Sequence, residues 1–207
     1  MAAFSVVIDA DCLHKLHLRN VLLQLATAGF FRPRWTGTIL NEFKESLRRR
    51  GVVEEYALDL LSTRLSDLYP DSEVKGFEHL IGTLACPDPN DEHVLAAAIV
   101  EKAGAIVTCN GRDFPRDCFE KFGVEILHPD DFLMDQVDLN SEVVITSIAV
   151  QIESYSKPEA DAVAFASYLT KAGCPAFGEF IFSNQRKIDD LVRHLRVASK
   201  GLNAADK

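Results

Sequence analysis

The sequence predicts an α/β protein: a three-layer α/β/α fold around a central parallel sheet, followed by a helical C-terminal extension. Three observations predict it. Short apolar runs typical of buried strands occur at residues 4–8, 105–109 and 124–127. Helical patterns separate these runs, and such alternation favours parallel strands covered by helices. After about residue 130 only helical patterns remain. We therefore expect an α/β domain over 1–135 and a helical extension over 136–207.

The first third of the chain predicts two strands and three helices. The run at 4–8 stops at Asp9, and a helical pattern then continues to Gly29. A short strand is expected over 30–35, although Pro33 weakens it. Thr36 is suited to cap a helix whose apolar residues share one face and which ends at Gly51. A further helix is expected over 52–69.

The remaining elements follow from turn residues and apolar spacing. Residues 71–85 are ambiguous, with a strand as one reading of 79–85. Asn90 is expected to cap an Ala-rich helix over 91–103, which Gly104 would end. The strands at 105–109 and 124–127 follow. Helices are then expected over 143–152, 159–171 and 177–195.

Composition narrows the classes of function. The net charge of −9 over 207 residues argues against broad nucleic-acid binding through a basic coat, although it allows a nuclease whose carboxylates bind cations. The five cysteines form no C-x-x-C pair and are expected to be free thiols in a reducing cytosol. No signal peptide or membrane-spanning run is visible, so we expect a cytoplasmic protein without a membrane partner.

Carboxylates follow two of the predicted strands. Asp9 comes directly after the first strand, and Asp113 follows the strand at 105–109. Ligands bind beyond the carboxyl ends of parallel strands, so these two side chains converge if the strands are neighbours. Asp91 begins the preceding helix, and Glu42 flanks the apolar face of its own helix. Four carboxylates around one crevice repel one another unless cations lie among them, and oxygen ligands suit Mg²⁺ or Mn²⁺ better than zinc.

The set resembles the four motifs of PIN-domain nucleases, and among them the VapC-type toxins of bacterial toxin–antitoxin pairs. Asp9-Ala10-Asp11-Cys12-Leu13 after the first strand is similar to the opening motif of the family. Residues 39–43 around Glu42 resemble the second motif, and Asp91 before an Ala-rich helix resembles the third. Residues 106–114 match T-x-N-x-x-D-F through Thr108, Asn110 and Asp113. Together these motifs are specific, whereas each alone is weak.

The resemblance implies metal-dependent RNA cleavage, with Asp9, Glu42, Asp91 and Asp113 as metal ligands and Mg²⁺ or Mn²⁺ as the cofactor. Thr108, Asn110 and Asp11 are expected to support the ligands. The resemblance also implies an RNA substrate and a cognate antitoxin that fills the site, and it admits a homodimer. Two departures stand out: Asp11 occupies a position where Asn is usual, and Asp88 and Glu92 lie close enough to Asp91 to share its role.

Two other functions remain open. Asp9-Ala10-Asp11 after a strand imitates the D-x-D of haloacid-dehalogenase-type phosphohydrolases. That family needs Thr or Val where this chain has Leu13, and Asp130-Asp131 fits its late acidic motif poorly. A PIN-like binding module without catalysis is the third reading, and the presence of all four carboxylates argues against it.

Overall fold

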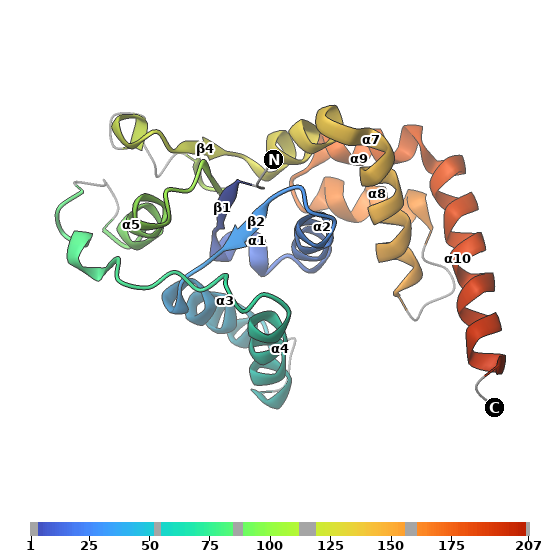
Figure 1. The fold of residues 1–207 in the computed structure, drawn as a ribbon, viewed down its shortest axis with the longest axis horizontal. Coiled ribbons are helices and arrows are strands. Elements are labelled where there is room, and N and C mark those ends of the chain that lie inside the picture. Colours follow the sequence, from blue (N-terminus) through green and yellow to red (C-terminus); the bar gives the residue numbers. More distant parts are fainter. Residues whose placement is uncertain (1–3, 52–54, 85–88, 112–118, 156–160, 206–207) are drawn as a thin grey trace. The chain divides into compact units, whose positions relative to one another are not determined.

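The computed structural model describes residues 4–51, 55–84, 89–111, 119–155 and 161–205. The chain forms two compact units (Figure 1). The first contains residues 1–16 and 29–129, and the second contains residues 17–28 and 130–207. Each unit is therefore described by itself below.

The first unit is built on a sheet of four parallel strands with flanking helices, as the sequence predicts (Figure 1). The strand order is β2-β1-β3-β4. In the register of the central pair, Val6 lies opposite Ala105 and Ile8 lies opposite Val107. Both central strands are fully buried, which explains why their residues are apolar apart from Ser5. The strands are β1 (Ser5–Ile8), β2 (Arg32–Arg34), β3 (Ala105–Val107) and β4 (Glu125–Leu127).

The described α-helices of this unit are α1 (Ala10–Leu13), α3 (Gly37–Arg49), α4 (Glu55–Leu68) and α5 (Glu92–Glu101). Thr36 caps α3 as expected, since its hydroxyl accepts a hydrogen bond from the backbone N–H of Ile39 at 3.1 Å. The predicted apolar face of α3 is buried through Ile39, Leu40, Phe43 and Leu47.

Three predictions about this unit are wrong in detail. The strand considered for 79–85 does not form over the described part, where a 3₁₀ turn (Glu78–Leu80) leads into further turns. Asp91, not Asn90, is the N-cap of α5. That helix ends at Glu101, and its C-cap residue Lys102, with a left-handed φ of 54°, closes it before Gly104.

A polar junction fastens α5 to the sheet. The Nε of Arg34 in β2 donates to Oε1 of Glu101 at 2.6 Å, and the Ser5 hydroxyl of β1 donates to the same oxygen at 2.8 Å. Arg34 also donates to the carbonyl of Asp71. Because α5 also packs on β1 and β3, the helix is held against the sheet.

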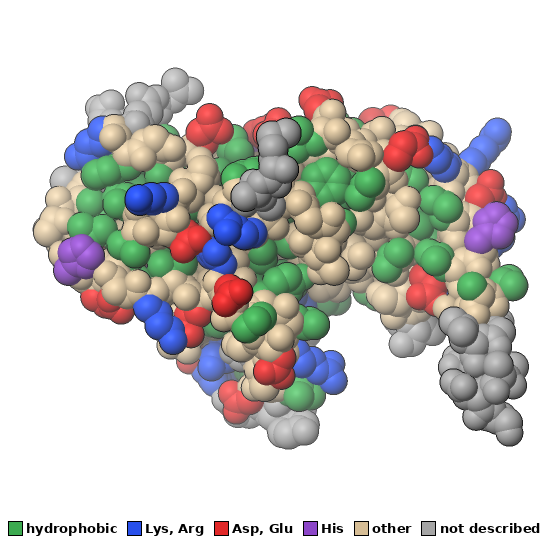
Figure 2. All heavy atoms as spheres, in the orientation of Figure 1, with side chains coloured by type: hydrophobic (Ala, Val, Ile, Leu, Met, Phe, Trp, Pro, Cys, Tyr) green, Lys and Arg blue, Asp and Glu red, His purple; other side chains and the backbone are tan. Residues whose placement is uncertain are grey.

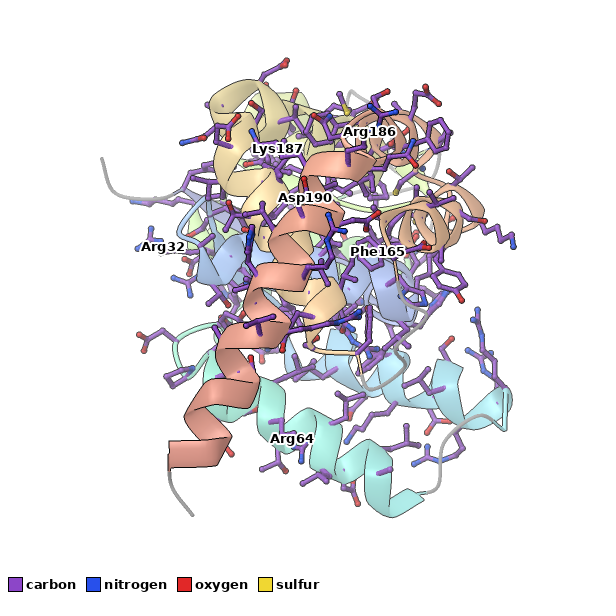
Figure 3. The ribbon with its side chains drawn as sticks, turned by 90° about the vertical axis from the view of Figure 1, so that its right-hand side faces the viewer. Arg32, Arg64, Phe165, Arg186, Lys187 and Asp190 are labelled. Atoms are coloured by element: carbon purple, nitrogen blue, oxygen red, sulfur yellow. The ribbon has the colours of Figure 1, made fainter. Side chains whose placement is uncertain are left out.

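The second unit consists of helices: α2 (Leu16–Thr27), α7 (Pro129–Glu153), α8 (Ala162–Lys171), α9 (Pro175–Ser183) and α10 (Gln185–Ala205). The sequence pattern misplaced two of their boundaries. The helix expected from 143 begins at Pro129 and is kinked at Asn140, and the helix expected over 177–195 is broken at Asn184. Lys187 of α10, labelled in Figure 3, donates to Glu142 of α7 at 2.5 Å.

Charged side chains of both signs are interspersed on the visible surface of each unit (Figure 2). No single basic patch dominates this face, in line with the acidic composition. Among the described residues, no helix combines the length and apolarity needed to cross a membrane.

Candidate metal site

The candidate site lies where β1 and β3 end side by side. Asp9 follows β1, and Thr108, Cys109 and Asn110 follow β3. The backbone N–H of Asp9 still donates to the carbonyl of Val107 at 3.1 Å, so the pairing of the two strands extends to the acidic residue itself. The two strands are neighbours, so the condition for convergence of the residues that follow them is met.

Asp9 is held by both of its carboxylate oxygens. Oδ1 accepts from the backbone N–H of Ala10 at 2.6 Å, and Oδ2 accepts from the Thr108 hydroxyl at 2.8 Å. The residue is only 7% exposed. Burial, followed by the negative charge of Asp11 and a smaller contribution from Asp91, raises the pKa of Asp9 to about 7, although its two hydrogen bonds act in the opposite direction.

Asp11 faces the end of β3 from the first turn of α1. One of its oxygens accepts from the backbone N–H of Cys109 at 2.9 Å and from the Thr108 hydroxyl at 3.2 Å. The Thr108 oxygen accepts in turn from the backbone N–H of Asn110 at 3.1 Å. Asp11, Thr108 and Asn110 thus form one hydrogen-bonded network with Asp9.

Asp91 and Glu92 are adjacent in the chain but have different environments. Asp91 makes no capping hydrogen bond to α5 through its side chain, and its charge contributes to the raised pKa of Asp9. Glu92 is buried, and its two oxygens accept from the backbone N–H groups of Gly82 at 2.5 Å and Leu84 at 2.6 Å. Glu92 is therefore occupied in holding the loop over 82–84, whereas Asp91 acts electrostatically on the candidate site.

Glu42 is connected to α5 through a histidine. Its Oε1 lies 3.1 Å from Nε2 of His93, and because a carboxylate only accepts, the ring nitrogen donates. The Glu42 side chain is 44% exposed, whereas that of His93 is 8% exposed. The sequence alone assigned no role to His93. Its position two residues after Asp91 was the feature that could have indicated a place near the site.

Asp113, the fourth carboxylate of the sequence prediction, lies outside the described residues, as does Asp88. The described part therefore brings Asp11 and Asp91 within electrostatic reach of Asp9, and links Glu42 to the helix that begins beside Asp91.

A thiol-containing group adjoins this network. Ligand atoms of Asp11, Cys12 and Cys109 lie within 4.8 Å of one another. Burial raises the pKa of the Cys12 thiol well above its ordinary value, which opposes its ionisation to a metal ligand. Thiol donors also suit soft ions rather than Mg²⁺. This group fits the predicted cofactor less well than the carboxylates do.

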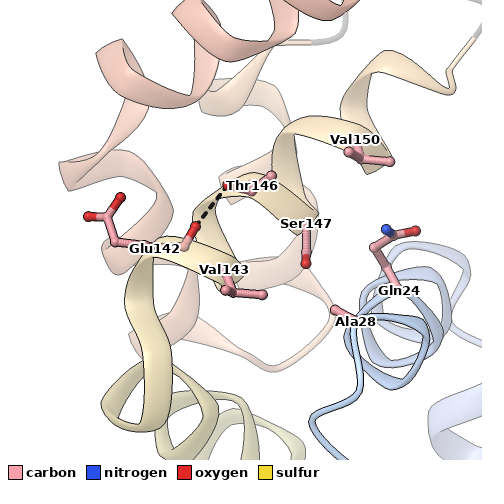
Figure 4. Close-up of a pocket in the computed structure, with 7 residues that line it drawn as sticks. All are labelled: Gln24, Ala28, Glu142, Val143, Thr146, Ser147 and Val150. Atoms are coloured by element: carbon pink, nitrogen blue, oxygen red, sulfur yellow. Dashed lines mark hydrogen bonds between the residues drawn. The ribbon is translucent and has the colours of Figure 1, made fainter.

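A pocket of about 340 Å³ lies elsewhere, in the second unit, between α2 and α7 (Figure 4). Its lining includes Gln24, Val143, Ser147 and Val150, with Glu142 as its one charged residue. None of the acidic residues considered above lines it, so it is not the candidate metal site.

The fold and the site together define an α/β protein whose carboxylates gather at the carboxyl ends of neighbouring parallel strands, where proteins of this class bind ligands. The family model described as "PIN domain" matches residues 5–112, more than half of the chain. The chain therefore belongs to the PIN-domain family. The match contains Asp9, Glu42 and Asp91 and ends just before Asp113.

The helical extension also has a counterpart. The family model described as "VapC50 C-terminal domain" matches residues 129–181, from the start of α7 into α9. A protein named "Putative ribonuclease VapC50" from Mycobacterium tuberculosis (strain ATCC 25618 / H37Rv) is 46% identical over 68 residues. This alignment covers 33% of the present chain and 40% of that relative. No solved structure matches the chain.

Proposed function

We propose that this protein is a divalent-metal-dependent endoribonuclease, the toxin of a VapC-type toxin–antitoxin pair. The observation that carries the proposal is the buried carboxylate of Asp9, whose pKa is raised to about 7 by burial and by neighbouring carboxylates, in the PIN-domain part of the chain. A cation beside Asp9 would relieve this repulsion. The similarity to a named ribonuclease supports the same reaction class.

The donor set fits a hard divalent ion. Asp91 adds to the raised pKa of Asp9, and Asp9, Asp91, Glu42 and Asp113 form the proposed ligand set. Mg²⁺ or Mn²⁺ prefers such oxygen donors. When bound, the ion would supply Lewis acidity that activates water and neutralises charge on the phosphodiester.

The surrounding residues would hold this set in place. The Thr108 hydroxyl fixes one oxygen of Asp9, and Asp11 fixes the backbone of Cys109 at the end of β3. We propose a positioning role for Thr108, Asn110 and Asp11, and a similar one for His93 toward Glu42. Such partners of metal ligands fix their orientation and tune their affinity.

Several further features belong to the same proposal. The substrate would be RNA, and a cognate antitoxin would cover the carboxylates. A homodimer, a cytoplasmic location and the division into domains at 1–135 and 136–207 remain predictions. The matched C-terminal family region at 129–181 supports a separate role for the extension. The comparisons give no support to a haloacid-dehalogenase-type phosphohydrolase or to a catalytically silent module.

The test is cleavage of RNA by the full chain, read by sequencing the RNA ends after induction in a bacterial host and after incubation of purified protein with RNA. We expect new ends with the wild type in Mg²⁺ or Mn²⁺ and none with Asp9→Asn. Asp59→Asn, the same substitution at an exposed position of α4, is the matched control and should cleave like the wild type. Undiminished cleavage by Asp9→Asn would refute the proposed site, and metal binding without RNA turnover would identify a silent module.

A further inference from the structure

Two cysteines and a lysine form a cluster beside the acidic network, which we call the thiol cluster. The Sγ atoms of Cys12 in α1 and Cys109 after β3 are 3.9 Å apart, although the residues are 97 positions apart in the chain. Nζ of Lys15 lies 2.9 Å from Sγ of Cys109. None of these side chains is among the proposed metal ligands, so the arrangement is unexplained by the proposed nuclease function.

The two thiols have different environments. Cys12 is fully buried, and its Sγ lies 3.6 Å from the carbonyl oxygen of Val107. Cys109 is partly exposed and has the lysine ammonium against its sulfur. A cationic neighbour favours the thiolate, which is the nucleophilic form of cysteine. Cys109 therefore has the surroundings of an attacking thiol, and Cys12 those of a thiol kept protonated beside it.

The pKa directions agree with this geometry. The hydrogen bond from Cys12 and the contact with Lys15 lower the pKa of the Cys109 thiol, against the effect of its burial. Burial raises the pKa of Cys12 well above its ordinary value. Only one thiol of the pair thus ionises readily, and it is the one that solvent reaches.

We propose that Cys109 is a peroxide-reactive modification site and that Cys12 is its resolving thiol. The Cys109 thiolate attacks one oxygen of hydrogen peroxide, the O–O bond breaks, and the leaving hydroxide takes up a proton to become water, which leaves a sulfenic acid on Cys109. The Cys12 thiol then gives up its proton as its sulfur attacks the Cys109 sulfur. The S–S bond forms, the S–O bond of the sulfenic acid breaks, and the departing hydroxide takes that proton and leaves as water. The two thiols lose two electrons and two protons, and one peroxide becomes two molecules of water.

The distance between the sulfurs allows this closure. A disulfide bond needs the sulfurs at about 2 Å, so the present 3.9 Å must shorten by side-chain rotation and a small backbone shift. A shift of the Cys109 backbone would move its N–H group, which donates a hydrogen bond to Asp11. The same Asp11 accepts from Thr108, which holds Asp9. Disulfide formation would therefore disturb the support of Asp9.

This consequence for RNA cleavage rests on the proposed function: oxidation should lower cleavage, and dithiothreitol should restore it. The chemistry itself is measured without activity. Treatment of the full chain with hydrogen peroxide, followed by digestion without reductant and mass spectrometry, reports each of the five cysteines separately. We expect a peptide pair joined through Cys12 and Cys109 that disappears on reduction.

Variants separate the role of each residue. In Cys12→Ser, the reaction with peroxide should stop at oxidised Cys109, without the internal disulfide. In Cys109→Ser, Cys12 should remain unmodified. Cys174→Ser, at a buried cysteine of the second unit, is the matched control and should form the disulfide like the wild type. Linkage of Cys12 to another cysteine, or peroxide-treated protein in which both thiols remain unmodified, would overturn the assignment.

Lys15 is tested by the pH profile of thiol alkylation. Lys15→Met removes the ammonium, so Cys109 should react with iodoacetamide roughly threefold to tenfold more slowly near neutral pH. The midpoint of its pH profile should move upward. Lys15→Arg retains the charge and should restore most of the rate. Identical profiles for the wild type and Lys15→Met would show that the lysine does not activate Cys109. If a variant lost RNA cleavage while these profiles stayed the same, the result would bear on the proposed nuclease function and not on the reactivity of Cys109.

Discussion

The Thr108 hydroxyl donates to Oδ2 of Asp9 across 2.8 Å and so ties the residue after β3 to the residue after β1. Both residues are buried, with Thr108 fully inaccessible. This bond lowers the pKa of Asp9, whereas burial and the nearby carboxylates raise it, and the net result is a value of about 7. Thr108 thus stabilises the ionised form that a metal ligand needs.

Thr108→Val should weaken both the fold and the site. Valine keeps the shape but leaves Oδ2 of Asp9 and the backbone N–H of Asn110 without the hydroxyl. We expect a loss of about 1–3 kcal/mol in the free energy of unfolding, measured with urea, and weaker Mn²⁺ binding. Thr108→Ser keeps the hydroxyl and should retain the metal affinity of the wild type. Equal metal affinity in the valine and serine variants would contradict this role.

Asp9→Asn should change how stability depends on pH in the metal-free protein. The pKa of Asp9 is 3.8 ordinarily and about 7 in the folded chain. Between these values the folded chain binds a proton that the unfolded chain releases, so the stability of the wild type falls as pH rises through this window and levels off above it. Asparagine does not ionise, so the variant lacks this component of the slope.

The comparison is made with urea unfolding in EDTA from about pH 4 to pH 8. The free energy of unfolding of Asp9→Asn should rise relative to that of the wild type as pH rises, by at most on the order of 4 kcal/mol at the upper end of this pH range. In excess Mn²⁺ only the wild type should be stabilised. A variant less stable than the wild type at every pH would make Asp9 a structural residue, since it also caps α1, and the metal assignment would fall.

Chelation should abolish RNA cleavage while leaving the protein folded. The site has several carboxylates and one strongly raised pKa, so cleavage is expected to need the charge of a bound cation. EDTA should reduce cleavage to background, and added Mg²⁺ or Mn²⁺ should restore it, with circular dichroism unchanged throughout. Cleavage that persists in excess chelator would refute the metal-dependent mechanism.

Local rules in the sequence predicted the strand ends and the capping of α3 because both depend on neighbouring residues. Asp9 follows an apolar run, and Thr36 precedes an amphipathic one. Contacts between distant segments were not predictable in this way. The pairing of His93 with Glu42 and of Cys12 with Cys109 depends on how helices and strands pack. Helical periodicity likewise missed the early start of α7, whose first turn is fixed by tertiary contacts.

Asp130 illustrates such a contact and gives a prediction for the second unit. It lies in the first turn of α7, yet its carboxylate accepts from the first-turn N–H groups of α9, at Ala176 (2.9 Å) and Phe177 (2.8 Å). The side chain of Cys174, the N-cap residue of α9, makes no capping hydrogen bond to this helix. Asp130→Asn should therefore cost about 1–2 kcal/mol of stability by thermal unfolding. Asp131→Asn, at an exposed neighbouring position, is the control and should change little.

The last prediction separates a proposed ligand from a fold support at adjacent positions. Glu92→Gln retains one acceptor oxygen but turns an amide N–H₂ toward the other backbone donor, at either Gly82 or Leu84. It should lower the free energy of unfolding by about 2–3 kcal/mol because a buried donor loses its partner. Asp91→Asn should lower the pKa of Asp9 by removing a negative charge.

Metal titration then distinguishes the two positions. Calorimetric binding of Mn²⁺ should be weakened at least tenfold by Asp91→Asn, the usual scale for loss of a direct or supporting metal contact. Glu92→Gln should bind Mn²⁺ like the wild type under conditions in which it is folded, because both Glu92 oxygens point to backbone N–H groups of the loop over 82–84. The reverse pattern, with metal affinity lost only in Glu92→Gln, would transfer the proposed ligand role from Asp91 to Glu92.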